Sequence, residues 1–348
     1  MKDIHKIFIH HRSSHHSNYS GYSQLLNHIN GRIIKGKPLI PYRLGKIISQ
    51  RLNNGAGIYD TNSLYKELEL FFHLLRARHK KIIIHYLNAE RDIRYNVRFH
   101  KKDNNTKSIG TFHKPPDILK KQITNVQYLK SLQGVIAVGP NQVNFLKEWL
   151  NISNVQFIPH GVDTNFFVPG PNNPDSSDHI IRLLFVGQHM RDFDALNYSI
   201  PRIKSIYPNC EIQAVFRKEY AKYLDQPSQV NIYHGISNEK LRSLYQEAKL
   251  LFLPLIDSTA CNSILEALAA GLPIITTDVG GNDGYIDDSC AIQVAPHRYG
   301  DLLDAAIMLI GKEQLRHTMK LQARRKALNF SWEKISHSIQ TFYHSLYQ

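Results

Sequence analysis

LFLPLIDSTACNSILEALAAGLPIITTDVGG (residues 251–281) contains the clearest secondary-structure signals of this chain. An apolar strand runs into a polar loop, a short helix built around Glu266 follows, and a second buried strand ends at Gly280 and Gly281. This order predicts a strand–helix–strand unit of a parallel sheet. In such sheets ligands lie at the carboxyl ends of the strands, and helix N-termini there hold anions.

The start of this helix predicts a phosphate site. Asn262 and Ser263 stand where they are expected to cap the helix, whose free N–H groups then face a phosphate. Glu266 adds one carboxylate a turn further on. The arrangement suits a nucleotide diphosphate, although a carboxylate in a first turn is also favoured by the helix dipole alone.

Length and composition predict an ordinary two-domain globular protein. The chain has 348 residues, 42% of them hydrophobic and 21% charged, which exceeds the usual size of one hydrophobic core. Cys210, Cys261 and Cys290 have no metal-ligand spacing and form no disulfide framework. The N-terminus does not read as a signal peptide, and no apolar run reaches the about 18 residues of a membrane span. We therefore expect a cytoplasmic protein.

The positive charge of the chain is concentrated in its first half. The net charge is +14, and residues 1–170 carry 25 Lys and Arg against 10 Asp and Glu. This asymmetry favours an anionic partner of the first half: a bilayer surface touched peripherally at the inner membrane face, an anionic lipid carrier or an acidic glycan. A solubility device remains the alternative. Nucleic acid is disfavoured, because no zinc-finger, basic-zipper or RNA-recognition signature accompanies the charge.

Two series of alternating strands and helices predict an α/β fold with two Rossmann-like, doubly wound domains. In the first series the clearest helices are 64–78 and 117–132, and residues 31–60 give no clear pattern. The loop-forming segment 159–179 separates the series, which places the junction at about residue 165 and the ligand in the cleft between the domains. Residues 331–348 form an amphipathic helix rich in aromatic residues.

Three segments carry a resemblance to a known family: FIPHGVDTNFFVP (157–169), YHGISNEKLRSLYQEAKLLFLP (233–254) and the segment 258–281. In this order they resemble the retaining glycosyltransferases of family 4, the glycosyl transferases group 1, which have the GT-B fold. The resemblance implies a basic acceptor-binding domain (1–165), a nucleotide-sugar-binding domain (166–330) and a terminal helix (331–348) that crosses back to the first domain.

The resemblance also implies an activity. Such enzymes move a sugar, commonly a hexose, from a nucleoside diphosphate donor to a hydroxyl acceptor with retention of configuration. They generally need no metal and no cofactor, so we expect none here. The expected acceptor is a lipid-linked or surface glycan, and the expected process is the synthesis of a surface glycan, a polysaccharide or a glycolipid.

The family usually has two glutamates eight positions apart in this signature. The second is Glu266 here, which the resemblance assigns to the ribose hydroxyls of the donor. The first, which touches the donor sugar, is replaced by Ser258. Asp257 stands beside it and can supply a carboxylate from one residue earlier.

FVGQHMRDFDAL (185–196) shows a second departure. The family commonly has an arginine directly after the glycine, here Gly187, and a lysine five positions on, and both hold the diphosphate. Gln188 and Phe193 stand there instead. A leaving diphosphate needs a positioned cation or several N–H donors. Arg191 is the nearest substitute, unless it pairs with a neighbouring aspartate, and Arg217 with Lys218 is the second candidate.

Two further candidates come from the first half. Gly21 follows the first strand where the family has a small-residue loop, and a backbone approach to phosphate needs a residue without a bulky side chain. His113 ends a strand at a place where the family often has a histidine that faces the donor sugar or acceptor. It would position a group and not abstract a proton, because the leaving phosphate oxygen itself helps to deprotonate the acceptor.

The N-terminal histidines His10, His11, His15 and His16 are not expected to form a metal site, because they lie in a loop without cysteine or acidic partners. A different class of function also stays open. The loss of both family cations and of the first glutamate can mark a GT-B protein that binds a nucleotide or glycan without turnover. A nucleic-acid protein, an epimerase and a phosphorylase are further alternatives on this scaffold.

Overall fold

The computed structural model describes residues 4–10, 19–55, 57–77, 81–99, 103–170 and 180–348, and these form two compact units. The first unit contains residues 4–10, Tyr22–His160 and Glu333–Gln348; the second contains residues 19–21 and Gly161–Trp332. The division falls after residue 160, close to the junction expected at about residue 165. The short segment 19–21 joins the second unit although the chain around it belongs to the first.

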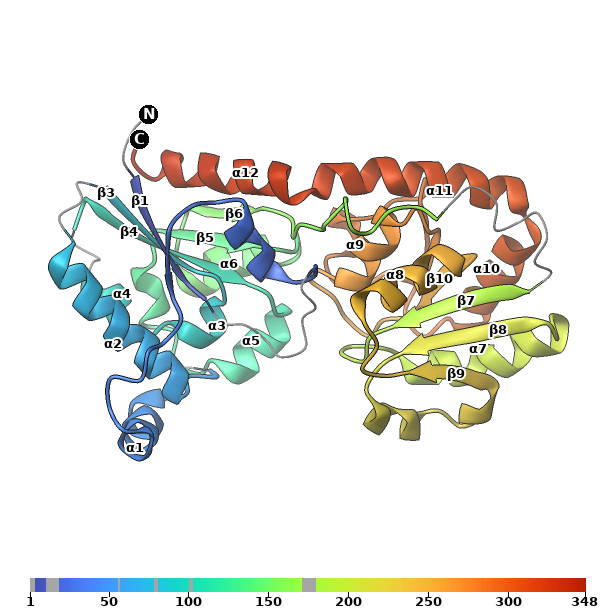
Figure 1. Ribbon diagram of the computed structural model, residues 1–348, viewed down its shortest axis with the longest axis horizontal. Coiled ribbons are helices and arrows are strands. Elements are labelled where there is room, and N and C mark those ends of the chain that lie inside the picture. The colour runs from blue at the N-terminus through green and yellow to red at the C-terminus, as the bar shows by residue number, and fades with distance from the viewer. Residues whose placement is uncertain (1–3, 11–18, 56, 78–80, 100–102, 171–179) are drawn as a thin grey trace. The chain divides into compact units, whose positions relative to one another are not determined.

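The first unit is built on a six-stranded parallel sheet in the order β2-β1-β3-β4-β5-β6 (Figure 1). Its strands are β1 (Ile4–Ile9), β2 (Arg32–Ile34), β3 (Lys81–Tyr86), β4 (Thr106–Phe112), β5 (Gly134–Ala137) and β6 (Val155–Phe157). The central strands β3, β4 and β5 are buried along nearly their whole length, as parallel strands covered by helices are. The chain runs outward from β1 in both directions, which makes this a doubly wound sheet.

Helix α2 (Thr61–Arg76) begins where Asp60 caps it: Oδ1 of Asp60 accepts a hydrogen bond from the backbone N–H of Ser63 at 2.9 Å. Leu64 and Leu70 are buried on the sheet. The expected helix 64–78 is therefore present, one turn longer at its start. The remaining helices of this unit are α3 (Ala89–Asp92), α4 (Asn96–Phe99), α5 (Pro116–Gln122) and α6 (Gln142–Leu150).

In the first unit, one region that the sequence left unassigned has regular structure, and one expected helix is shorter than predicted. Residues 31–60, which showed no pattern, contain β2 and the helix α1 (Tyr42–Asn53). Helix α1 packs Ile48 and Leu52 against the core of the first unit, but its fully buried residues are Gly45 and Ser49, and Leu44 and Ile47 are exposed, so its apolar residues do not mark a single buried face. The helix expected over 117–132 ends at Gln122, because the N–H of Asn125 bonds to the carbonyl of Gly55 (3.2 Å) and not to its own turn.

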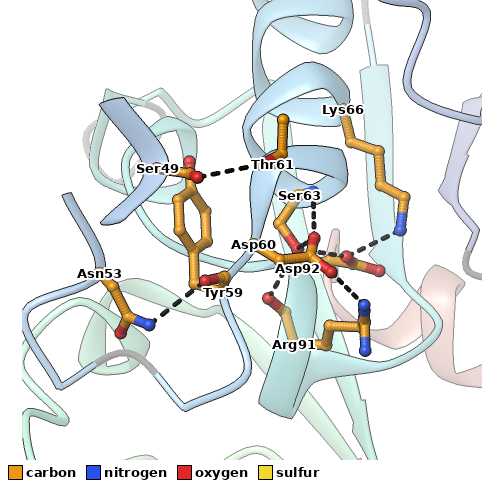
Figure 2. A network of polar contacts seen from close by, with 9 residues as sticks. All are labelled: Ser49, Asn53, Tyr59, Asp60, Thr61, Ser63, Lys66, Arg91 and Asp92. Carbon is orange, nitrogen blue, oxygen red and sulfur yellow. Dashed lines mark hydrogen bonds and ion pairs between the residues drawn. The ribbon is translucent and has the colours of Figure 1, made fainter. Parts of the chain in front are cut away.

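A buried ion pair connects α2 with α3 (Figure 2). The Nζ atom of Lys66 lies 2.8 Å from Oδ1 of Asp92, and both side chains are 0% exposed. The same oxygen accepts a hydrogen bond from Oγ of Ser63 at 3.1 Å, while Arg91 pairs with Asp60 nearby. Burial lowers the pKa of Lys66 and raises that of Asp92, and the opposite charge of the partner counteracts both shifts.

The terminal helix α12 (Trp332–Ser345) belongs to the first unit from residue 333 on. Phe342 lies so close to Gly134 of β5 that a Cβ atom there would be 2.9 Å from its ring. The hydroxyl of Tyr343 lies 2.6 Å from Nδ1 of the buried His85. The hydroxyl of Tyr347 donates to the carbonyl of Ile82, also at 2.6 Å. The terminal helix thus packs on the first sheet, as the resemblance implied.

The second unit has a six-stranded parallel sheet of its own, in the order β12-β11-β10-β7-β8-β9. Its strands are β7 (Ile181–Val186), β8 (Cys210–Val215), β9 (Val230–Tyr233), β10 (Leu250–Leu253), β11 (Ile274–Thr277) and β12 (Ala291–Val294). Its helices are α7 (Phe193–Ile206), α8 (Asn238–Glu247), α9 (Asn262–Ala269), α10 (Tyr299–Gly311) and α11 (Glu313–Ala327). Two doubly wound parallel sheets confirm the α/β fold class.

Candidate functional site

The strand order of the second sheet reverses between β7 and β10. The chain moves outward from β7 through β8 and β9, and then returns to the other side of β7 with β10. Loops that leave two such strands diverge and open a crevice at the carboxyl ends, which is where open α/β sheets bind ligands. Here the two loops are tied together: the N–H of Ile256 bonds to the carbonyl of Met190 (2.9 Å), and that of Asp192 to Pro254 (3.1 Å).

Helix α9 begins directly at this switch point. Its N-cap residue is Cys261, and no side chain of the described residues caps it. The expectation that Asn262 and Ser263 cap the helix was therefore wrong, because both residues lie inside its first turn. The hydroxyl of Ser263 instead donates to the carbonyl of Val186 at the end of β7 (3.2 Å). It also accepts a hydrogen bond from Nη2 of Arg191 at 3.1 Å.

Arg191 is held by backbone oxygens at the same place. Its Nε donates to the carbonyl of Val186 and its Nη1 to that of His189, both at 2.9 Å. It does not pair with its neighbour Asp192, whose carboxylate caps α7 by accepting from the N–H of Ala195 (3.0 Å). The guanidinium is therefore fixed beside the N-terminus of α9, where both the cation and the helix favour an anion. Its catalytic role stays a prediction.

Glu266 lies one turn into α9 and is buried. Its Oε1 accepts a hydrogen bond from Oγ of Ser20 (2.5 Å), and its Oε2 accepts one from the hydroxyl of Tyr245 (2.9 Å). Burial raises its pKa to about 7, although these two hydrogen bonds and the charge of Arg191 act in the opposite direction. A carboxylate that accepts hydrogen bonds from two hydroxyl groups of the protein is also suited to accept hydrogen bonds from the hydroxyl groups of a ligand.

Sequence reasoning missed the two partners of Glu266. Tyr245 is near the end of α8, and its ring packs edge-on against that of Phe167 with centroids 5.9 Å apart. Ser20 precedes Gly21, and neither its type nor its spacing relates it to Glu266. A buried tyrosine near a helix end is a weak signal for a hydroxyl partner. The contact of Ser20 could not be found from the sequence, because it joins distant parts of the chain.

Two glycines at the site have positive φ angles, which favour glycine over other residues. Gly21 has φ +90° and Gly187 has φ +93°. A Cβ atom on Gly187 would lie 2.6 Å from Nη2 of Arg191, so only glycine leaves room for the guanidinium. Gln188, which replaces the family's arginine, follows directly and is half-buried.

Asp257 and Ser258 form the loop after β10, and this loop packs on Gly280. The N–H of Ser258 bonds to Oδ1 of its neighbour Asp257 at 2.7 Å, and its carbonyl accepts from the N–H of Gly281 at 3.0 Å. Gly280 has φ +61°, and a Cβ atom on it would be 2.0 Å from the carbonyl oxygen of Ser258. The close approach of two backbones thus explains the glycine after β11.

The second pair of predicted cations lies apart from this cluster. Arg217 and Lys218 follow β8 and are exposed, and Nη1 of Arg217 lies 3.6 Å from Oε1 of Glu219. Phe193, which stands in the place of the family's lysine, packs edge-on against Phe185 and Phe216. An aromatic anchor of α7 has therefore taken the position of a cation, and Arg191 is the cation that the structure places beside Ser263 and α9.

His113 belongs to the first unit, at the end of β4. Its Nε2 donates to the carbonyl of Leu87 at 2.7 Å, and its backbone N–H donates to Oε1 of Glu90 at 3.1 Å. Its ring stands edge-on to that of Tyr22 (centroids 4.8 Å apart). The residue is thus oriented by three neighbours, as a positioning group should be.

The described residues contain no group of three or more His, Cys, Asp or Glu side chains arranged to hold a metal ion. Of the N-terminal histidines, His11, His15 and His16 lie outside the described residues. Within the described part of the chain, no helix is long and apolar enough to cross a membrane.

Comparison with known proteins shows what this chain is similar to. Residues 213–326 match the family model of the glycosyl transferases group 1. One component of the phosphatidylinositol N-acetylglucosaminyltransferase of Arabidopsis thaliana is 23% identical over 207 residues, which is 57% of this chain and 45% of the relative. The aligned part thus spans about half the length of that curated relative.

Solved structures agree over nearly the whole chain. Sucrose-phosphate synthase from Thermosynechococcus elongatus has a TM-score of 0.68 at 17% identity and covers 98% of this chain and 88% of its own. HepE of Anabaena, solved in complex with UDP and glucose, has a TM-score of 0.64 at 12% identity and covers 98% and 100%. The fold is that of the GT-B glycosyltransferases, and the resemblance to the group 1 glycosyltransferases is confirmed.

Proposed function

We propose that the protein is a retaining, metal-independent glycosyltransferase that moves a sugar from a nucleoside diphosphate donor to a hydroxyl acceptor in surface glycan or glycolipid synthesis. One observation carries this proposal. The buried carboxylate of Glu266 and the fixed guanidinium of Arg191 flank the first turn of α9 at the switch point of the second sheet. A carboxylate for ribose hydroxyls and a cation for phosphate are the two chemistries that a nucleoside diphosphate requires.

In this proposal the donor diphosphate lies at the N-terminus of α9. When the bond between the sugar and the diphosphate breaks, negative charge grows on the leaving oxygen. The N–H groups of α9 and the guanidinium of Arg191 stabilise that charge, which lowers the barrier. The leaving oxygen takes the proton of the acceptor hydroxyl, so no protein base is required, and His113 acts as a positioning residue.

The named relatives support the donor and acceptor classes. HepE of Anabaena was solved with UDP and glucose, and the Arabidopsis thaliana relative is named for an N-acetylglucosaminyltransferase that acts on phosphatidylinositol. A nucleoside diphosphate sugar as donor and a lipid-linked or glycan hydroxyl as acceptor follow from this analogy. The excess basic charge of the first half agrees with an anionic acceptor or a peripheral contact at the inner membrane face.

A thermal-shift screen of nucleoside diphosphates and their sugars tests the proposal. A ligand at 100 times its Kd adds about 2.7 kcal/mol, which raises the Tm by about 5 °C or more. We expect such a shift with one base, unchanged when EDTA is added. Glu266→Ala should abolish this shift, because the ribose hydroxyls lose the carboxylate that accepts their hydrogen bonds.

Glu247→Ala is the matched control for this screen, since Glu247 is an exposed residue at the end of α8. It should leave the shift unchanged. The proposed donor site is wrong if no nucleotide raises the Tm of the wild type. It is also wrong if a nucleotide raises the Tm of Glu266→Ala by as much as that of the control.

A non-catalytic GT-B binder is the second candidate, because Ser258, Gln188 and Phe193 replace three family residues. Ser258→Glu separates the two. Since Ser258 is buried and packed on Gly280, we expect a larger side chain to displace the loop and lower transfer by about 10- to 100-fold, or about 1.4–2.7 kcal/mol. Turnover of the donor, measured as released nucleoside diphosphate, distinguishes an enzyme from a non-catalytic binder. A gain of turnover would instead identify a degenerate site.

A further inference from the structure

Helix α1 in the first unit exposes the apolar residues that a helix normally buries. Tyr42 is 66% exposed, Ile47 50% and Leu44 48%. Leu39, just before the helix, is 49% exposed. The proposed donor site does not use any of these residues, and solvent exposure of so many large apolar side chains on one short segment is a signal of a binding surface.

The opposite face of α1 explains why these residues point outward. Gly45 lies against Tyr65 of α2, where a Cβ atom would be 2.9 Å from the tyrosine hydroxyl oxygen. The hydroxyl of Ser49 lies 3.3 Å from Oγ1 of Thr61. The helix is thus anchored to α2 through Gly45 and Ser49, while Ile48 and Leu52 pack on the core of the first unit, and these contacts fix its orientation.

The outer face of α1 combines apolar and basic residues. Residues three and four apart share a helix face, so Ile47 lies between Arg43 and Arg51 and next to Leu44. Arg43 and Arg51 are exposed, and so is Lys46. We call the surface formed by Leu39, Tyr42, Arg43, Leu44, Lys46, Ile47 and Arg51 the α1 face.

The surrounding sequence carries no opposing charge. Residues 31–59 contain six basic residues and no Asp or Glu. The basic residues are Arg32, Lys35, Lys37, Arg43, Lys46 and Arg51. A surface with this charge is complementary to an anionic one, and the apolar side chains among the cations distinguish it from a purely electrostatic patch.

We propose that the α1 face binds the surface of an anionic lipid bilayer. The arginine and lysine side chains contact lipid phosphates, while Tyr42, Leu44 and Ile47 enter the boundary between headgroups and acyl chains. The apolar residues favour a bilayer over nucleic acid, because a phosphate backbone offers no apolar layer to receive them. The proposed bilayer contact does not depend on the donor site. Vesicle binding is measured without any nucleotide, so one proposal can be refuted while the other stands.

Vesicle sedimentation tests the α1 face. The full chain should sediment with phosphatidylglycerol-containing vesicles, less so at high salt, and not with pure phosphatidylcholine vesicles. Each of Arg43→Gln, Lys46→Gln and Arg51→Gln should lower the partition coefficient about fivefold. The double variant Leu44→Ser with Ile47→Ser should lower it about tenfold. Ile206→Ser is the matched control: Ile206 is 51% exposed on α7 of the second unit, and its replacement should change nothing.

A fluorescent label distinguishes insertion from simple charge attraction. Cys210, Cys261 and Cys290 are buried, so a thiol placed by Ile47→Cys is the accessible one to label with an environment-sensitive dye. We expect a blue shift with anionic vesicles for Ile47→Cys and none for Ile206→Cys.

Three results would overturn the proposal. Binding that survives all the α1 variants would place the contact elsewhere. If the protein sediments with the vesicles but the emission of a dye at residue 47 does not shift, the apolar residues do not insert into the bilayer. Binding to a soluble single-stranded DNA with no binding to anionic vesicles would assign the face to a soluble polyanion instead.

Discussion

Replacing Lys66 by methionine is expected to lower the free energy of unfolding of the first unit by about 3–5 kcal/mol. The ammonium of Lys66 is the cation that pairs with the buried carboxylate of Asp92 at 2.8 Å, and neither side chain reaches solvent. The second oxygen of Asp92, Oδ2, has no hydrogen-bond partner among the described residues. Removing the lysine therefore leaves an anion in an apolar interior, where the hydroxyl of Ser63 is a weak substitute for a cation.

Urea unfolding followed by tryptophan fluorescence measures this loss. The first unit contains Trp149 and the second contains Trp332, so a shared Trp332→Phe background makes the signal specific to the first unit. Lys121→Met, at an exposed position, is the control and should change the free energy of unfolding by less than about 0.5 kcal/mol.

The double variant Lys66→Met with Asp92→Leu distinguishes the contribution of the two charges to stability from the contribution of side-chain packing. It should recover much of the loss, because apolar residues of similar volume replace both charges. A double variant as unstable as Lys66→Met, or a single variant within about 1 kcal/mol of wild type, would contradict the role that we assign to the pair.

The second large effect is a pH dependence that Glu266 imposes on the second unit. Burial raises its pKa to about 7, whereas an unfolded glutamate titrates near 4.5. Between these two values the native state keeps the proton and the unfolded state does not. The stabilisation is fully present below the unfolded pKa and is lost as the pH rises through the folded pKa, a change of about 3 kcal/mol.

Glu266→Gln keeps the shape of the protonated carboxyl and cannot ionise. We expect the wild type to lose about 3 kcal/mol of stability relative to this variant between about pH 4.5 and pH 8. Trp332 fluorescence in a Trp149→Phe background reports the second unit. Glu247→Gln, on the exposed end of α8, should follow the wild type at every pH. Parallel curves for the wild type and Glu266→Gln would show that folding does not raise the pKa of Glu266.

The sequence predicted the parts of the site that are local in the chain. The segment 251–281 contains its own strand, loop and helix, so Glu266 and the loop of Asp257 and Ser258 could be placed before the structure was known. Arg191 was found by its distance of four residues from Gly187. Its partners were not, because the carbonyl oxygens of Val186 and His189 have no sequence signal.

What the sequence did not predict depends on contacts between distant residues or on an unusual helix. Ser20 and Tyr245 reach Glu266 from other parts of the chain. Helix α1 was missed although Ile48 and Leu52 pack on the core of the first unit, because its fully buried positions are Gly45 and Ser49 while Ile47 is exposed. The N-cap of α9 was misplaced because Asn262 and Ser263 are of residue types that commonly cap helices, whereas both lie in the first turn and Ser263 bonds to Val186 and Arg191.

Neither unit is made from one continuous piece of chain, and this sets an order of completion during synthesis. Ser20, which bonds to Glu266, leaves the ribosome long before the second unit exists, and the ring of Tyr19 stacks on Phe166 of that unit (centroids 3.7 Å apart). Conversely, Tyr343 reaches His85 only after the whole second unit has been translated. A growing chain therefore carries a first sheet that still lacks α12 while the second unit is being made, and an exposed sheet of this kind is where a nascent chain is open to aggregation and to chaperones.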